Sequence, residues 1–145
     1  GRRISLVFVL LAACLMAAGC GKKADPFCPS GEKPPAVTDL EVSGADGAVV
    51  LSWTVPEGVT GRETCRVYRS ALPPGEGCPG CPRRYVPFRV LYRGDLPERG
   101  SAVIEDRDVE ERTLYSYRLV LCDDRGVCGS PSNEAEILFG GKKNP

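Results

Sequence analysis

Seven short apolar runs, each ended by a turn signal, constrain the fold of this chain more than any other feature of its sequence. The runs cover residues 37–42, 48–55, 65–69, 85–92, 102–105, 114–122 and 132–139. They are rich in β-branched and aromatic residues, and the segments between them are rich in Gly, Pro, Asp and Ser, which is typical of strands joined by turns. None of the runs has the 3.6-residue period of an amphipathic helix. The pattern predicts an all-β fold, a seven-stranded antiparallel sandwich of two sheets.

The run over residues 114–122 is the longest and alternates most clearly. Tyr115, Tyr117, Leu119 and Leu121 share one parity, and Ser116, Arg118 and Val120 share the other. Because successive side chains of a strand point to opposite faces, the first set is expected to face the core. Trp53 lies among apolar residues of the second run, so we expect it to belong to the core rather than to a ligand platform.

The charge balance and the absence of histidine narrow the functional classes. Lys and Arg number 19, as do Asp and Glu, so the overall charge gives no reason to expect nucleic-acid binding. A chain without histidine has no Ser-His-Asp triad, no Cys-His pair and no histidine-ligated zinc site. We therefore expect a non-enzymatic protein with no cofactor and no metal.

Residues 1–19 have the features of a signal peptide. Two arginines precede an apolar run over residues 4–18, which is shorter than the roughly 20 residues that a permanent membrane span needs. The run ends in LMAAGC, residues 15–20, which resembles the lipobox of bacterial lipoproteins. The resemblance implies cleavage between Gly19 and Cys20 and acylation of Cys20, with a diacylglycerol on the thiol and an acyl chain such as palmitate on the amine. Two or three acyl chains would anchor the mature protein stably in a membrane.

Residues 20–34 are predicted to form the lipidated N-terminus and a Pro-rich tether, and residues 140–145 a short tail. Gly21 follows the lipidated cysteine, whereas in well-studied Gram-negative bacteria an Asp at this position retains a lipoprotein in the inner membrane. We therefore expect a cell-envelope protein, in the outer membrane rather than the inner. The stretch CGKKADP, residues 20–26, also resembles the start of small lipoproteins that assist the outer-membrane lipopolysaccharide machinery, so an accessory role in outer-membrane assembly is an alternative.

Five segments resemble strands of a fibronectin type III domain. They are PPAVTDLEVS (34–43), VVLSWTVP (49–56), CRVYRS (65–70), VEERTLYSYRLVL (109–121) and SPSNEAEI (130–137). The resemblance covers residues 35–139 and implies that Trp53 is the core tryptophan. It also implies that Tyr115 is the corner tyrosine, whose hydroxyl bonds to a nearby backbone group. An insert at residues 71–84 and the cysteines depart from the family pattern.

Eight cysteines indicate an oxidising compartment. Once Cys20 is lipidated, the candidates for disulfides are Cys28, Cys65, Cys78, Cys81, Cys122 and Cys128. Cys122 and Cys128 flank the turn DDRGV and are predicted to pair across it. Cys65 shares inward parity with Val67 whereas Cys122 points outward, which disfavours a bond between them. Cys28 is the alternative partner for Cys65, and that bond would tie the tether to the domain.

Cys78 and Cys81 are separated only by Pro-Gly. This dipeptide is typical of a type II turn, which holds the flanking α-carbons less than about 7 Å apart, within reach of a disulfide. No helix N-terminus is predicted here to lower a thiol pKa, and no histidine is available to complete a zinc site. We therefore predict a structural disulfide, with thiol–disulfide exchange or metal binding at this pair as the alternatives.

Two further motifs receive structural interpretations. The integrin tripeptide Arg-Gly-Asp at 93–95 is also ordinary turn chemistry, and a turn is the prediction. Five acidic residues precede the sixth predicted strand: Glu105, Asp106, Asp108, Glu110 and Glu111. Because two arginines are interleaved with them, we expect a solvated, self-paired loop rather than catalytic carboxylates or a calcium site.

The function expected from these features is that of a membrane-anchored envelope lipoprotein that presents a fibronectin type III domain for binding or spacing. Its partners would be the membrane, through the lipid on Cys20, and a protein or polysaccharide of the envelope. The insert at 71–84 and the loop at 123–127 are the predicted contact surfaces.

Overall fold

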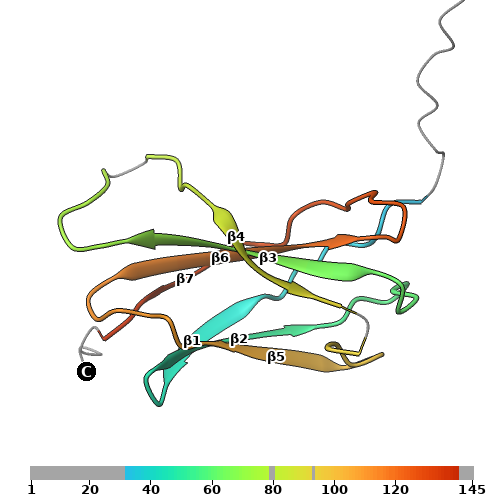
Figure 1. Ribbon diagram of the computed structural model, residues 1–145, viewed down its shortest axis with the longest axis horizontal. Coiled ribbons are helices and arrows are strands. Elements are labelled where there is room, and N and C mark those ends of the chain that lie inside the picture. Colours follow the sequence, from blue (N-terminus) through green and yellow to red (C-terminus); the bar gives the residue numbers. More distant parts are fainter. Residues whose placement is uncertain (1–31, 79–80, 93, 141–145) are drawn as a thin grey trace, which may run out of the picture. The chain divides into compact units, whose positions relative to one another are not determined.

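Seven antiparallel strands in two sheets make up the part of the chain that this computed structural model describes, residues 32–78, 81–92 and 94–140 (Figure 1). The strands are β1 (Glu41–Ala45), β2 (Ala48–Thr54), β3 (Thr64–Leu72), β4 (Val86–Leu91), β5 (Ser101–Asp106), β6 (Leu114–Cys122) and β7 (Ala135–Leu138). One sheet has the order β1-β2-β5 and the other β4-β3-β6-β7. The predicted all-β two-sheet sandwich is confirmed. The expected signal peptide, Cys20, Cys28 and residues 141–145 lie outside the described residues.

The first strand lies further along the chain than the sequence predicted. Residues 37–42 were expected to form it, but Val37 and Leu40 are buried in the core from a segment that precedes β1. The strand then runs on to Asp46 and Gly47, whose φ angles of 50° and 76° are the two positive values that a type I′ turn needs. Because that turn takes only two residues, the residues just before it stay paired with β2.

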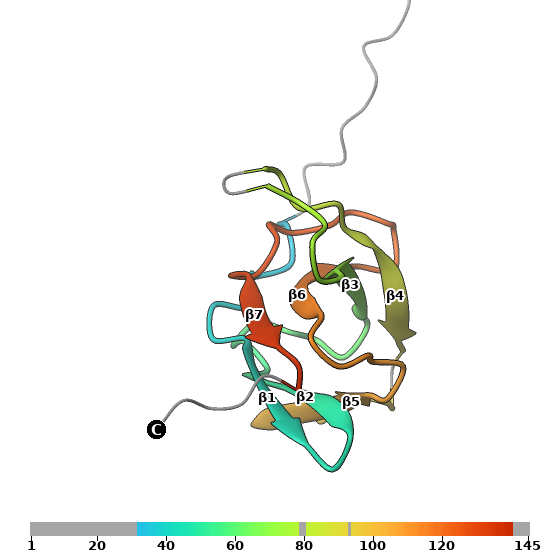
Figure 2. The ribbon, with the colours of Figure 1, turned by 90° about the vertical axis from the view of Figure 1, so that its left-hand side faces the viewer.

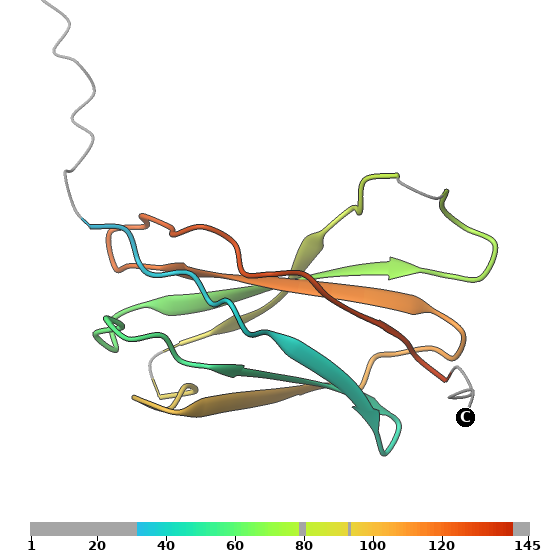
Figure 3. The same ribbon diagram turned by 180° about the vertical axis from the view of Figure 1, so that it is seen from behind.

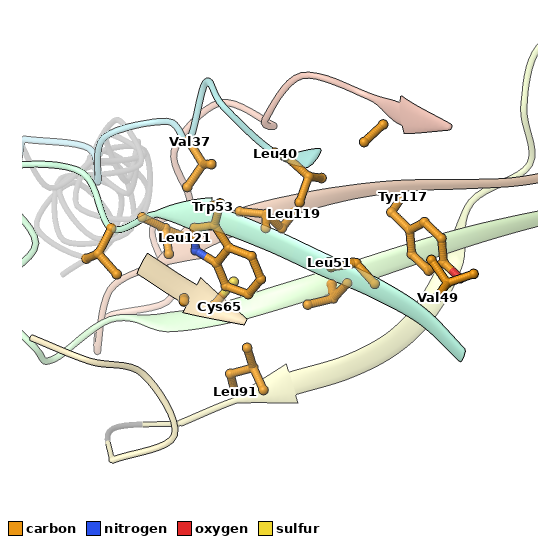
Figure 4. Close-up of a cluster of buried hydrophobic side chains, with 14 of the residues drawn as sticks. Val37, Leu40, Val49, Leu51, Trp53, Cys65, Leu91, Tyr117, Leu119 and Leu121 are labelled. Atoms are coloured by element: carbon orange, nitrogen blue, oxygen red, sulfur yellow. The ribbon is translucent and has the colours of Figure 1, made fainter. Parts of the chain in front are cut away.

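The core lies between the two sheets and is built from alternate residues of the central strands (Figure 4). The inward set predicted for β6 is buried: Tyr115, Tyr117, Leu119 and Leu121. Trp53 of β2 is 3% exposed and lies in the same cluster as Leu51 and Cys65. The hydrophobic alternation of the sequence is therefore the alternation that closes the sandwich.

Tyr115 forms a tyrosine corner. Its ring is buried, and its hydroxyl accepts a hydrogen bond of 2.8 Å from the backbone N–H of Glu110, five residues upstream. This contact ties the β5–β6 connection to the start of β6.

We expect Tyr115→Phe to lower the free energy of unfolding by about 1–2 kcal/mol, because it removes the acceptor of a backbone N–H. Urea denaturation followed by circular dichroism would measure the change. Tyr92→Phe is the matched control, since Tyr92 is 61% exposed, and should change stability by less than about 0.5 kcal/mol. Equal stability of Tyr115→Phe and the parent protein would contradict the assignment.

The chain enters the domain alongside the β6–β7 connection (Figure 3). Asn133 fixes this contact: its side-chain oxygen accepts from the Leu40 N–H and its amide donates to the Leu40 carbonyl, both at 2.9 Å. Gly129 is required nearby, because a Cβ at this position would collide with the Pro34 carbonyl. The segment before β1 is thus held in place without belonging to either sheet.

The connections gather at two opposite ends of the sandwich (Figures 1 and 2). The loops 55–63, 92–100 and 123–134 lie at the end where the chain enters. The turn at 46–47 and the connections 73–85 and 107–113 lie at the other end, where the described chain also finishes. The two predicted contact surfaces, the insert and the loop at 123–127, are therefore at opposite ends of the domain.

Candidate functional site

The insert is shorter than the sequence predicted. Ala71 and Leu72 still belong to β3 and pair with β6, so the connection to β4 covers 73–85 rather than 71–84. Cys78 and Cys81 are disulfide-bonded, with their α-carbons 5.3 Å apart, and the Cys81 N–H donates to the Cys78 carbonyl at 3.1 Å. That hydrogen bond closes a four-residue turn, and both cysteines are exposed on the connection.

The returning half of this connection is held against the outer face of the four-stranded sheet. Arg83 forms a 2.9 Å ion pair with Glu136 of β7, and the same carboxylate accepts a 2.7 Å hydrogen bond from the Ser116 hydroxyl of β6. Next to it, the Arg118 guanidinium carbon lies 4.2 Å from the centre of the Tyr85 ring. These contacts give residues 83–85 a defined position on the sheet.

A hollow of about 560 Å³ lies between the connection and the sheet, with Cys78, Cys81 and Arg118 in its lining. Two buried polar atoms beside it have no hydrogen-bond partner: the Tyr85 hydroxyl and Nε of Arg118. Burial, together with the nearby charge of Glu134, raises the pKa of Tyr85 to about 12. The hydroxyl therefore stays protonated and is able to donate.

The loop at 123–127 is closed by a disulfide between Cys122 and Cys128, whose α-carbons are 4.0 Å apart. Asp123 organises the loop, since its side chain accepts hydrogen bonds from the backbone N–H groups of Arg125 and Val127 and pairs with the Arg125 guanidinium. Hydrogen bonding from Arg125 holds the pKa of Asp123 below its usual range. Cys122 itself is buried, although its parity was expected to expose it, because the start of the β6–β7 connection folds back beside β6.

Among the described residues, Cys65 carries a free thiol in the core, with no exposed surface. Burial raises the pKa of this thiol from 9.0 to about 12. A thiol that is inaccessible and stays protonated is neither a nucleophile nor a metal ligand at neutral pH. The tether cysteine considered as its partner, Cys28, lies outside the described residues.

The free energy of unfolding should fall at alkaline pH, and ionisation of Cys65 should contribute to this fall. Because the folded-state pKa of Cys65 lies above its unfolded value of 9.0, its contribution is fully present below pH 9 and is lost as pH rises toward 12. Between pH 8 and pH 10.5, urea titrations should show a fall in the free energy of unfolding that is about 2 kcal/mol smaller in Cys65→Ala than in the parent protein. An unchanged pH slope in the variant would rule this out.

The acidic cluster is not the solvated loop that the sequence suggested, because Asp106 is completely buried. Its carboxylate forms a 2.8 Å ion pair with Arg69 of the opposite sheet and accepts a 2.8 Å hydrogen bond from the Tyr117 hydroxyl. It also accepts from the backbone N–H of Asp108 at 3.0 Å. Burial and the Asp106 charge raise the pKa of Tyr117. The other four acidic residues are exposed as predicted, and Glu105 pairs with Arg107 at 2.6 Å.

A cavity of about 390 Å³ lies at the chain-entry end, between the loops 56–63 and 92–99. Trp53 and Leu121 line it from the core, and Tyr92 lines it from the second loop. Glu63 is its buried acidic group; although burial opposes ionisation, hydrogen bonds from Thr60 and Arg62 hold the pKa of Glu63 below its usual range. This cavity was not predicted, because the first loop carries no motif and Arg-Gly-Asp in the second loop was interpreted only as a turn.

Other expected or excluded sites can be located as well. Asp95 of the integrin tripeptide closes a turn, since its N–H donates to the Tyr92 carbonyl at 2.9 Å and its carboxylate accepts from the Tyr92 N–H at 2.8 Å. Arg93 lies outside the described residues. In the described ranges, no three His, Cys, Asp or Glu side chains come together as metal ligands. The same ranges hold no helix with the length and apolar character of a membrane span.

By sequence, the chain matches no family model and no curated protein. By structure, it resembles the third fibronectin III domain of the human KIAA0343 protein, with a TM-score of 0.54, 14% identity, and coverage of 86% of this chain and 98% of that domain. The chain has the fibronectin type III fold. An Fn3-like protein from Clostridium thermocellum (TM-score 0.47, 18% identity) matches over 76% of this chain and 95% of its own. Pectate lyase Pel3 from Pectobacterium carotovorum (TM-score 0.46, 20% identity) matches over 67% of this chain.

The pectate lyase match spans a quarter of the enzyme's chain. Fibronectin type III domains are generally non-catalytic, and a shared fold does not transfer an activity. In this fibronectin type III fold, the two exposed features that the sequence singled out are both stapled by disulfides, the 73–85 connection within itself and the 123–127 loop across its base. The disulfides limit how far these two surfaces can change shape.

Proposed function

We propose that this protein is a lipoprotein of the cell envelope, anchored through Cys20, that presents one fibronectin type III domain as a non-catalytic binding and spacing module. The observation that carries the proposal is the order of features along the sequence: an apolar run, LMAAGC at residues 15–20, a Pro-rich stretch, and then the domain. In this order, the four features would provide export, lipid attachment, a spacer and a folded unit.

The point of chain entry supports a module whose far end is free to bind. The segment from Cys20 to Glu32 spans at most about 40 Å when extended. Glu32 lines one hollow together with residues of the loops 55–63 and 123–134. The connection at 73–85 lies at the opposite end of the sandwich (Figure 1), which makes it the surface of the domain that we assign to binding.

Metabolic labelling with palmitate tests the anchor. We expect the parent chain to be labelled, Cys20→Ala to be unlabelled, and Cys28→Ala, as the matched control, to be labelled like the parent. Fractionation of the membranes tests the destination, where Gly21→Asp should move the protein from the outer to the inner membrane. Labelling that persists in Cys20→Ala would refute the lipid anchor.

Affinity capture from solubilised envelopes tests the binding role. We expect one envelope component to be retained by the full chain and lost when residues 74–83 are replaced by a short Gly-Ser linker. A variant with the same linker in place of 124–126 serves as the control for loop replacement in general. If both variants retain the same components as the parent, the 73–85 connection is not the contact surface.

A thiol–disulfide function is the second candidate, favoured by the exposure of Cys78 and Cys81 beside a hollow. In this role the reduced pair would reduce a substrate disulfide and become oxidised itself. Reduction of insulin by the reduced protein, and its loss in Cys78→Ser, would be the expected result. Insulin reduction no faster than that by a free dithiol would exclude it.

A further inference from the structure

Charge is unequally divided between the two sheets. Four arginines and one glutamate lie on strands of the four-stranded sheet: Arg66, Arg69, Arg89, Arg118 and Glu136. Three carboxylates and no basic residue lie on strands of the three-stranded sheet: Glu41, Glu105 and Asp106. Residues 32–140 as a whole contain 13 Lys and Arg against 18 Asp and Glu. The four-stranded sheet is therefore basic, although the domain as a whole is acidic.

Two of the four arginines have internal partners. Arg69 is paired with Asp106, and Arg89 donates to the Glu105 carbonyl at the edge of the other sheet, at 3.2 Å. Arg66 and Arg118 alternate with buried residues and so face outward. Neither of them takes part in any ion pair among the described residues. They are cations without an internal counter-charge on the outer face of this sheet.

Aromatic and aliphatic side chains surround these two cations. Tyr68 is opposite Arg118 in the β3–β6 register, and the Arg118 guanidinium carbon lies 5.9 Å from the centre of the Tyr68 ring and 4.2 Å from that of Tyr85. Val90 is opposite Arg66 in the β3–β4 register and is 40% exposed. We call the five residues, Arg66, Tyr68, Tyr85, Val90 and Arg118, the arginine–tyrosine face. Tyrosine and arginine are enriched at protein interfaces.

The face is hollowed on both sides of the Arg118 stack. The 560 Å³ hollow is lined by Tyr85 and Arg118, and a second hollow of about 320 Å³ is lined by Arg66, Tyr68 and Val90. The Tyr85 hydroxyl and Nε of Arg118 lack partners at the first of them. Among the described strands, β4 is an edge strand that pairs only with β3. An extended ligand would be able to cross both hollows.

We propose that the arginine–tyrosine face binds an acidic, extended segment of a partner protein. Its two outward cations complement carboxylates, while Val90 and the tyrosine rings complement aliphatic side chains, and an extended polypeptide offers both kinds of group in alternation. An acidic polysaccharide would offer the negative charge without the aliphatic groups, so a polypeptide is the better match. Glu134 and Glu136 on the β7 side direct the acidic segment toward β3 and β4. The proposal deepens the binding role proposed above and rests on it, but it does not depend on the lipid anchor.

The test uses the full chain, purified in detergent, and a fluorescein-labelled twelve-residue peptide of alternating glutamate and valine. We expect fluorescence anisotropy to show saturable binding that weakens as salt rises. Arg66→Gln/Arg118→Gln should weaken binding by at least about tenfold. Arg62→Gln/Arg112→Gln, which removes the same charge from exposed arginines outside the face, should weaken it by less than about twofold. Arg66→Gln alone, at an exposed position, should still weaken binding several-fold if the double variant does not fold.

Three results would overturn the proposal. The first is no saturable binding of the peptide at concentrations up to 1 mM in low salt. The second is an equal loss of affinity in the face variant and the control variant. The third is tighter binding of dextran sulfate, or equal binding of an alternating glutamate and glycine peptide, which would make the face a general polyanion site. If the peptide fails but an envelope component is still captured through the 73–85 connection, the binding role stands and this face is not its site.

Discussion

Asp106→Ala is expected to lower the free energy of unfolding by about 3–5 kcal/mol, the largest effect of any single substitution of a polar residue in this domain. The change would leave the Tyr117 hydroxyl without its acceptor and the Arg69 guanidinium, whose side chain is 19% exposed, without its buried counter-charge. Since domains of this size are stable by about 5–15 kcal/mol, this loss would be a large fraction of the total free energy of unfolding. Urea denaturation followed by circular dichroism would measure the loss.

Two further variants test whether the loss of stability in Asp106→Ala comes from the buried network or from the change in charge alone. Asp108 contacts the same guanidinium at 3.4 Å but is 92% exposed, so Asp108→Ala should cost less than about 1 kcal/mol. Arg69→Met/Asp106→Leu, which replaces both charges by apolar groups, should recover much of the stability lost in Asp106→Ala. Equal stability of the Asp106 and Asp108 variants would mean that the ion pair between the sheets contributes nothing.

Trp53→Ala is expected to cost about 3–5 kcal/mol, the range for removal of a large aromatic side chain from a core. Its ring lies among Leu51 and Cys65 and also lines the 390 Å³ cavity, so the truncation would join new empty volume to that cavity. Thermal unfolding followed by circular dichroism is the suitable measurement, because Trp53 is the only tryptophan and its fluorescence disappears with it.

Trp53→Ala needs two controls: a smaller ring at the same position and a truncation at an exposed position. Trp53→Phe should lose less stability than Trp53→Ala, because it keeps most of the apolar contact. Val103→Ala on the adjacent strand, at a position 59% exposed, should change stability by less than about 0.5 kcal/mol. A loss below 2 kcal/mol for Trp53→Ala would show that the ring does not support the core.

Much of the fold follows from local patterns in the sequence. The alternation in residues 114–122 predicts which side chains of β6 face the core, because a strand that closes a sandwich must separate its two faces. Ser116 and Cys122, which have the other parity, are buried as well, and this the alternation does not predict. The first strand was misplaced for a related reason. Val37 and Leu40 are apolar and buried as strand residues would be, but they are three residues apart, which is not the two-residue period of a strand. Their segment lies beside the β6–β7 connection and joins no sheet. Burial pattern and hydrogen-bonded pairing are separate properties, and only the first is visible in a sequence.

The burial of Asp106 was missed although the sequence contains a signal for it. Ala102, Ile104 and Asp106 share one parity in β5, which places the carboxylate on the inward face. The surrounding charged residues hid this signal, since a cluster of acidic and basic residues is usually solvated. The cavity near Trp53 had no such signal, because it depends on two loops whose approach is determined by the tertiary fold.

The opposite placement of chain entry and chain exit gives the domain a mechanical property. Glu32 lies beside the loops 55–63 and 123–134, and Gly140 lies beside Glu111 of the 107–113 connection. These loops and this connection are at opposite ends of the sandwich (Figures 1 and 3). A force applied through these two points would act along the strands and load their hydrogen bonds in shear, so that many bonds resist together instead of opening one after another. A domain loaded in this way would keep its full length under tension until those bonds give way together.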